Sequence, residues 1–318
     1  MQEKDYKKGK TPFGGLFGEP TPAKASGLVF SVATVLPTVL SFIFLLILAF
    51  CGKAETDGYQ NQDWYLYANY LLPQISFALV AYFYLRYRQI PLKNALFSQK
   101  CKPKYFLIAF FLQIGLFGLS ELNSIFLNWL GKFGYNDAGI SLPSVEGFGF
   151  VGVFLVIGVL APVLEEIVFR GMLLNGLKKT FSMPVAVVLC GALFALFHQN
   201  PAQTVYQFCC GTAFALVAIK SGSVLPTVLS HFLNNAFVLI LYKAGVAQFS
   251  SGVLILLLCL SAVCLTGVIG YLIFKDKQES TVKTSEDKKS GKNKFFVFAS
   301  VGIALCALTW LIVLCAGM

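Results

Sequence analysis

Charged residues are scarce in this sequence. Only 13% of the 318 residues are Asp, Glu, Lys or Arg, and 57% are hydrophobic, whereas soluble domains carry about 25% charged residues. A chain with so few polar side chains cannot cover the surface of a water-soluble globule, which excludes an ordinary soluble domain. The mean hydropathy of +0.72 indicates that the solvent of this chain is lipid.

The sequence also lacks the alternation of apolar and polar residues that a transmembrane barrel requires. Its apolar residues form long runs, and a spanning helix needs about 20 of them. The expected spans are residues 28–51, 65–87, 104–130, 148–169, 183–198, 203–219, 224–242, 251–274 and 295–317. The fifth and sixth are short, which keeps eight spans as an alternative to nine. The sequence therefore predicts an all-α, polytopic transmembrane helical bundle.

No cleavable signal peptide is apparent, because the first 27 residues are polar and the first apolar run is too long. The net charge is +10, and the basic residues gather in the N-terminal tail and in residues 86–104, 170–179 and 275–294. By the positive-inside rule, we expect a cytoplasmic N-terminus in the cell membrane and, with nine spans, a C-terminus outside. Orientation and anionic lipid explain this charge, so we expect no nucleic-acid partner.

Internal repeats are absent, but the composition divides the chain. We expect a mobile cytoplasmic tail at 1–27, N-terminal spans at 28–147, a core at 148–245 that holds the unusual polar residues, and C-terminal spans at 246–318. Residues 275–294 have mixed charge and no apolar periodicity, which is typical of a disordered linker.

The nine cysteines show no paired spacing and lie mostly in apolar runs. This pattern indicates small buried hydrophobes rather than disulfides or thiolate metal sites. Cys190 precedes His198, but a nucleophilic thiolate needs a positive, partly exposed setting, and Cys190 lies in an apolar run.

Ionisable groups are costly within spans, and those of this chain cluster in the central segment. In APVLEEIVFRG, Glu166 and Arg170 are four residues apart, so they share a helix face and can pair. Glu165 is rotated by about 100° from Glu166 and points elsewhere. In a low-dielectric setting, we expect Glu165 to be suited to taking a proton from water. The alternative is an ion pair that only locks the helix.

The two histidines of the whole chain fall in the same segment. His198 ends FALFH, with Phe194 four residues before it, and His231 begins HFLNN, with Asn235 four residues after it. His231 and Asn235 share a helical face. Both side chains can donate to one developing oxyanion. Either histidine alone could be a satisfied core residue, but their concentration beside the glutamates favours a site.

These motifs, in this order on successive spans, resemble the CPBP family of intramembrane peptidases. That family includes the type II CAAX prenyl endopeptidases and bacterial proteins linked to bacteriocin processing or self-immunity. Its pattern is Glu-Glu-x-x-x-Arg, Phe-x-x-x-His and His-x-x-x-Asn. The matching residues are Glu165, Glu166, Arg170, Phe194, His198, His231 and Asn235.

The resemblance implies hydrolysis of a peptide bond in a hydrophobic peptide or membrane-protein substrate. It implies that Glu165 activates water, that His198 holds that water, and that His231 and Asn235 stabilise the oxyanion. Glu166 and Arg170 would brace the site.

The cofactor stays open at this point. Glu165, His198 and His231 are a possible Zn²⁺ ligand set that leaves a position for water, although the sequence has no HExxH pair. Asn235 beside His231 favours glutamate-activated water without a metal.

Two alternatives come from other classes of protein. The first is a catalytically silent membrane partner that serves immunity or regulates a sensor. The second is a transporter, for which repeated halves would be expected. The oligomeric state and the identity of the substrate do not follow from the sequence.

Overall fold

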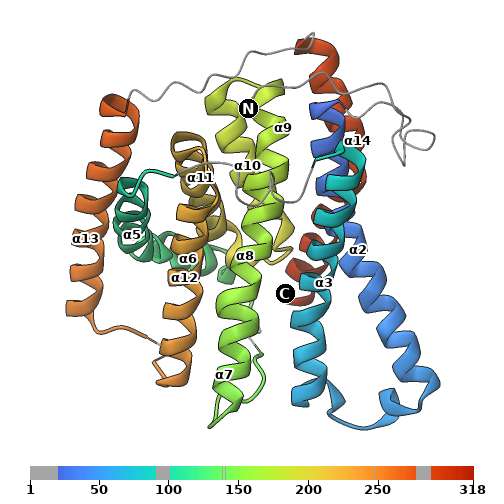
Figure 1. Cartoon of the computed structure of the whole chain (residues 1–318). Helices are drawn as coiled ribbons and strands as arrows, with labels where there is room; N and C mark the ends of the chain where they lie inside the picture. Colours follow the sequence, from blue (N-terminus) through green and yellow to red (C-terminus); the bar gives the residue numbers. More distant parts are fainter. Residues whose placement is uncertain (1–20, 91–100, 138, 140, 247, 277–287) are drawn as a thin grey trace.

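The fold is known from a computed structural model, which describes residues 21–90, 101–137, 139, 141–246, 248–276 and 288–318 (Figure 1). Within these ranges the chain is helical and has no strand. The prediction of an all-α transmembrane bundle is confirmed, since eight helices among the described residues are long and apolar enough to cross a membrane. Their bounds are Pro22–Phe50, Asp63–Arg88, Lys104–Gly131, Gly149–Thr180, Pro201–Ser221, Leu225–Lys243, Ser251–Lys275 and Ser290–Ala316.

The first helix, α2 (Pro22–Phe50), begins before the predicted residue 28. Thr21 accepts a hydrogen bond from the Lys24 amide at 3.5 Å, and Pro22 occupies the first turn. A threonine cap followed by proline is a common helix start, so residues 22–27 are helical and do not belong to the expected tail. Residues 1–20 of that tail lie outside the described residues.

The last helix, α14 (Lys288–Ala316), likewise begins earlier than the predicted residue 295. Its lysines favour helix and extend the apolar helix by about two turns, which shortens the expected linker of residues 275–294 at this end. At the other end, helix continues through η6 (Tyr271–Lys275). Residues 277–287 of that linker lie outside the described residues.

The central helical segment is continuous from residue 149 to residue 180 and continues past the predicted end at residue 169. It consists of α7 (Gly149–Val153), η3 (Phe154–Leu160), α8 (Ala161–Glu166), η4 (Ile167–Leu173) and α9 (Leu174–Thr180). Both η3 and η4 are π-helical, so helix turns closed by hydrogen bonds between residues five apart flank α8 on each side. Such π segments occur often at functional sites.

The next helix, α10 (Met183–Phe197), has only 15 residues and is too short for a complete span. It forms a tight hairpin with α11 (Thr204–Ser221). A Cβ on Gly191 would lie 2.7 Å from the Thr212 backbone nitrogen, and one on Gly211 would lie 2.9 Å from Gly191 Cα. Small residues therefore permit this close helix approach.

The turn of the hairpin is held from a third helix, α6 (Ser120–Gly131). The Asn123 amide donates to the Ala202 carbonyl, and its oxygen accepts from the Tyr206 backbone N–H at 3.3 Å. These bonds satisfy backbone groups of the turn in the interior of the bundle, where water is scarce.

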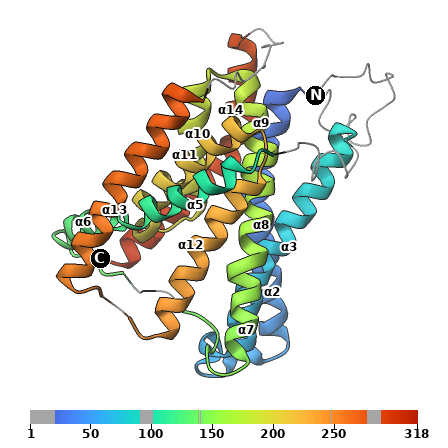
Figure 2. The ribbon, with the colours of Figure 1, turned by 60° about the vertical axis from the view of Figure 1, so that its left-hand side comes forward.

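The remaining helices are α3 (Asp63–Arg88), α5 (Lys104–Phe117), α12 (Leu225–Lys243) and α13 (Ser251–Gly270). The α9–α10 turn and the beginnings of α2 and α14 lie at the top of Figure 1, and the ends of α2 and α12 lie at the bottom. Figure 2 shows the same order from another side. The segments with interior polar side chains, α8 and α12, run through the middle of the bundle.

Candidate active site

Glu166 is the centre of a buried polar cluster between α8 and α12. Its Oε1 accepts a hydrogen bond from Arg170 Nη1 at 2.7 Å and one from His231 Nδ1 at 3.0 Å. The Glu166 and Arg170 side chains are fully buried. Arg170 Nη2 also donates to the Gly211 carbonyl at 3.2 Å, which links the pair to α11. The expected pairing of Glu166 with Arg170 is therefore present, and it also holds His231.

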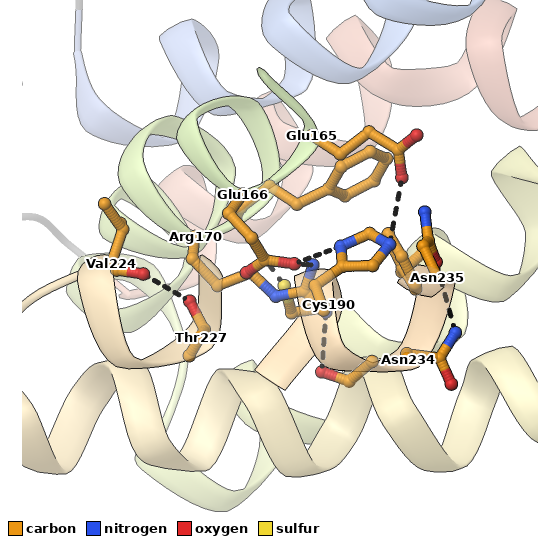
Figure 3. Close-up of polar contacts among 12 residues, drawn as sticks. Glu165, Glu166, Arg170, Cys190, Val224, Thr227, Asn234 and Asn235 are labelled. Atoms are coloured by element: carbon orange, nitrogen blue, oxygen red, sulfur yellow. Dashed lines mark hydrogen bonds and ion pairs between the residues drawn. The ribbon is translucent and has the colours of Figure 1, made fainter. Parts of the chain in front are cut away.

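Glu165 extends from the same helix in a different direction, as Figure 3 shows. Its Oε2 lies 3.9 Å from His231 Nε2, and its side chain is only 12% exposed. This oxygen is buried and has no hydrogen-bond partner among the described residues. The two adjacent glutamates thus approach opposite nitrogens of one imidazole ring, Glu166 at Nδ1 and Glu165 at Nε2.

His198 lies at the end of α10 and contacts the cluster through an aromatic ring. Phe194 packs against His198 at 4.7 Å and against His231 at 5.9 Å between ring centroids. The guanidinium carbon of Arg170 lies 4.3 Å from the centre of the same ring. His198 Nδ1 is 2.8 Å from the Phe194 carbonyl. Because a carbonyl only accepts, Nδ1 carries the proton and Nε2 of the neutral ring is free to accept one.

Asn235 is held by the π-helical segment η3. Its Nδ2 donates to the Ile157 carbonyl at 2.8 Å. The Ala161 amide in this segment donates five residues back, to Val156. In the same register residue 162 would donate to Ile157, but Pro162 has no N–H. The proline therefore leaves a carbonyl without its helical donor, and Asn235 supplies that donor.

Asn234, Gln113 and Tyr206 join the site without having been predicted. Asn234 Nδ2 donates to Asn235 Oδ1 at 3.2 Å. Asn234 Oδ1 in turn accepts from Gln113 Nε2 at 3.2 Å and from the Tyr206 hydroxyl at 2.7 Å. In the sequence, Gln113 is a lone amide in an apolar run. A polar side chain in a span is energetically unfavourable, and the same reasoning identified Glu165.

Cys190 is fully buried, and its thiol donates to the Phe169 carbonyl at 3.7 Å. A buried thiol in contact with a carbonyl oxygen is an unreactive packing group, because a thiolate there would be desolvated. This agrees with the expectation that Cys190 is no nucleophile.

The possible metal ligands of the site do not form a complete set among the described residues. Among the described residues, no three His, Cys, Asp or Glu side chains form a group that could hold a metal ion. Glu165, His198 and His231 are therefore not gathered as three ligands.

The arrangement presents a buried carboxylate oxygen, an imidazole with a free nitrogen and an amide with a spare N–H within one region of the bundle. These are the group types needed to deprotonate water and to stabilise the oxyanion that forms when water attacks a carbonyl. The Glu166–Arg170 pair supplies the orientation of the His231 ring.

Comparison with known proteins identifies one family in the central segment. Residues 147–237, from α7 into α12, match the family model described as "Type II CAAX prenyl endopeptidase Rce1-like". Searches of curated proteins and of solved structures gave no significant match. The matched residues include both histidines, the glutamate pair, Arg170 and Asn235. Residues 147–237 therefore form an Rce1-like domain, and this match supports the predicted resemblance of the multi-pass membrane protein to CPBP-type intramembrane peptidases.

Proposed function

We propose that the protein hydrolyses a peptide bond of a membrane-associated substrate by means of water activated by Glu165. The observation that carries this proposal is the Glu165 carboxylate itself. Its Oε2 is buried, is 3.9 Å from His231 Nε2 and has no hydrogen-bond partner among the described residues. A buried acceptor without a hydrogen bond costs free energy, and a bound water or substrate would remove that cost.

In the proposed reaction, Glu165 and the free Nε2 of His198 hold one water molecule. Glu165 takes a proton as the water oxygen bonds to the carbonyl carbon, and the carbonyl oxygen becomes an oxyanion. His231 Nε2–H and the spare Asn235 N–H donate to that oxyanion. The intermediate then collapses, the C–N bond breaks, and Glu165 gives its proton to the leaving amine.

The bond from His231 Nδ1 to Glu166 limits how His231 can take part. With Nδ1–H directed at a carboxylate, the ring donates from Nε2 only when both nitrogens are protonated. Two ionised glutamates and Arg170 leave one net negative charge, which the doubly protonated His231 would neutralise. The proposed oxyanion donor is therefore the imidazolium of His231.

The same contact is compatible with a metal mechanism, since a carboxylate on Nδ1 also orients a histidine that ligates metal through Nε2. The two N–H groups proposed to donate to the oxyanion, from His231 and Asn235, favour glutamate-activated water. A chelator arm in the assay separates the two mechanisms.

We infer that residues 148–245 carry this activity, and that the protein lies in the cell membrane with the segment before α2 on the cytoplasmic side. The alternative of a catalytically silent immunity or sensor-regulating partner keeps the same fold. A silent partner would have no need for the free acceptor of Glu165 or the free donor of Asn235. A transporter would be expected to spread its charges over more helices.

The test is a cleavage assay with purified protein in detergent micelles. The probes are a fluorogenic peptide with a farnesylated CAAX terminus, the same peptide without the farnesyl group, and a library of hydrophobic peptides. We expect cleavage of at least one probe, insensitivity to chelator, and loss of cleavage in Glu165→Ala, His198→Ala and His231→Ala. Absence of cleavage by folded wild-type protein, or equal activity in all three variants, would overturn the proposal. Loss of cleavage on chelation would replace the water mechanism with a metal one.

A further inference from the structure

Asn234 lies next to the proposed oxyanion donor and is unusually well fixed. It is 6% exposed, and Gln113 is fully buried. Its Oδ1 accepts two hydrogen bonds, from Tyr206 on α11 at 2.7 Å and from Gln113 on α5 at 3.2 Å. Since a carbonyl oxygen has two lone pairs, this oxygen is saturated. The Asn234 amide therefore has one defined orientation, with its NH₂ group directed away from both donors.

That orientation determines the orientation of the neighbouring amide. Asn234 Nδ2 donates to Asn235 Oδ1 at 3.2 Å, and Asn235 Nδ2 donates to Ile157 at 2.8 Å. The oxygen of Asn235 is thus fixed at one end and its nitrogen at the other. Nδ2 carries two N–H groups, so one remains for a substrate.

The orientation matters because an asparagine side chain can exchange its oxygen and nitrogen by a half-turn. The exchanged Asn235 would present a carbonyl dipole to an oxyanion, and attraction would become repulsion. It would also set its NH₂ against the NH₂ of Asn234, and its oxygen against the Ile157 carbonyl. Preorganised donors of this kind stabilise charge without reorientation during the reaction.

We propose that Asn234, clamped by Gln113 and Tyr206, is a positioning residue that fixes the Asn235 amide with its N–H toward the reacting carbonyl. The inference rests on the proposed function. It adds three residues from three helices to the site, and it assigns α5 and α11 a part in orienting an oxyanion donor on α12.

A purely structural role for Asn234 predicts a different pattern of kinetics. Loss of packing lowers the amount of folded protein and affects the rate whether or not Asn235 is present. A residue that acts through Asn235 has no further effect once Asn235 is gone, because the interaction that it supports is already absent. The double-mutant comparison therefore separates the two roles.

The experiment measures steady-state cleavage kinetics of the farnesylated CAAX peptide, or of the best-cleaved library peptide, by folded protein in micelles. The variants are Asn234→Leu, the milder Tyr206→Phe, Asn235→Ala and the two combinations with Asn235→Ala. Ser230→Ala is the matched control, because it removes another buried α5–α12 hydrogen bond, from Ser230 Oγ to the Ala109 carbonyl at 2.6 Å.

We expect Asn234→Leu to lower kcat about tenfold or more and Tyr206→Phe about threefold, with KM within about twofold. In the Asn235→Ala background neither change should lower the rate further, and Ser230→Ala should stay near the wild-type rate. Equal loss in both backgrounds, or an unchanged kcat in Asn234→Leu and Tyr206→Phe, would overturn the positioning role alone. A wild-type kcat in Asn235→Ala would contradict the proposed oxyanion donor and, with it, this inference.

Discussion

Adjacent glutamates have different surroundings in this protein because they project from one helix about 100° apart. Glu166 Oε1 accepts hydrogen bonds from Arg170 and His231. Glu165 Oε2 lies 3.9 Å from the other nitrogen of the same imidazole, Nε2. Glu166 is therefore fixed through Oε1, whereas Glu165 Oε2 has no hydrogen-bond partner among the described residues and faces the imidazole nitrogen that Glu166 does not hold.

The buried ion pair of Glu166 and Arg170 should contribute to stability. Arg170→Met removes the charge that offsets buried Glu166, so the free energy of unfolding should fall by about 3–5 kcal/mol. Denaturation of purified protein in mixed micelles measures this change. Replacing both partners, as Glu166→Met with Arg170→Met, should recover part of the loss because no unpaired charge remains.

The matched control is Lys53→Met in the exposed 3-10 turn η1 (Lys53–Glu55), which should change the unfolding free energy by less than about 0.5 kcal/mol. Arg170→Met protein as stable as the wild type would show that the pair does not brace the site.

The sequence predicted the residues of the site whose spacing is helical. The four-residue separation of Glu166 and Arg170 was sufficient to predict their ion pair, which the structure contains. It could not predict that Glu166 would also hold His231, because that contact depends on how α8 and α12 pack. The clamp on Asn234 was missed for the same reason, since its partners come from α5 and α11.

At the scale of elements, the segment from Gly149 to Thr180 combines a helix with a local defect. Pro162 lies between two π-helical stretches and leaves the Ile157 carbonyl available to Asn235. The sequence indicated a disturbance at the proline. It did not indicate the register, because π and α registers differ by one residue and depend on tertiary contacts.

Pro162→Ala should separate stability from activity. The new N–H can bond within the helix, and alanine favours helix, so stability should be unchanged or higher. The same N–H competes for the Ile157 carbonyl, so kcat should fall about tenfold as Asn235 loses its anchor. Cleavage kinetics and thermal denaturation check the two parts.

Pro37→Ala, at another proline within a helix, is the control and should leave kcat unchanged. An equal kcat for Pro162→Ala and wild-type protein would contradict the role given to the freed carbonyl.

Helix ends were the least predictable feature. The cap of Thr21 with Pro22 is a start signal in the sequence, yet hydropathy alone placed the first span six residues later. Residues 170–180 extend the central segment because Lys178 and Lys179 are good helix formers at a helix C-terminus. An apolar run marks the part of a helix that lies in lipid, and helices continue beyond it.

At the scale of the whole molecule, a second polar cluster ties three helices together near residue 276. The Asp276 carboxylate accepts from Tyr105 at 2.6 Å and from Lys104 at 3.3 Å, and its carbonyl accepts from Lys220 at 3.0 Å. The cluster fixes the end of η6 against α5 and α11. Its lysines are among the basic residues that favour the cytoplasmic side.

This charge distribution predicts the topology. Reporter domains inserted after Gln89 and after Gly222 should be cytoplasmic, and those after Gly58 and after Gly245 should be outside. Paired reporters, one fluorescent only inside the cell and one enzymatically active only outside, measure the side. The reverse pattern at all four positions would contradict the orientation, and a mixed pattern would contradict the order of spans.

Glu165→Gln tests whether Glu165 activates water for peptide hydrolysis, because the amide keeps the shape of the side chain and removes the base. The measurement is the single-turnover cleavage rate on the best-cleaved peptide, with unfolding recorded in parallel and Glu146→Gln in an exposed loop as the control. We predict a rate about 10³-fold below wild type for Glu165→Gln, unchanged unfolding, and a control within about twofold. A Glu165→Gln rate within tenfold of wild type would contradict the role of Glu165 as the base.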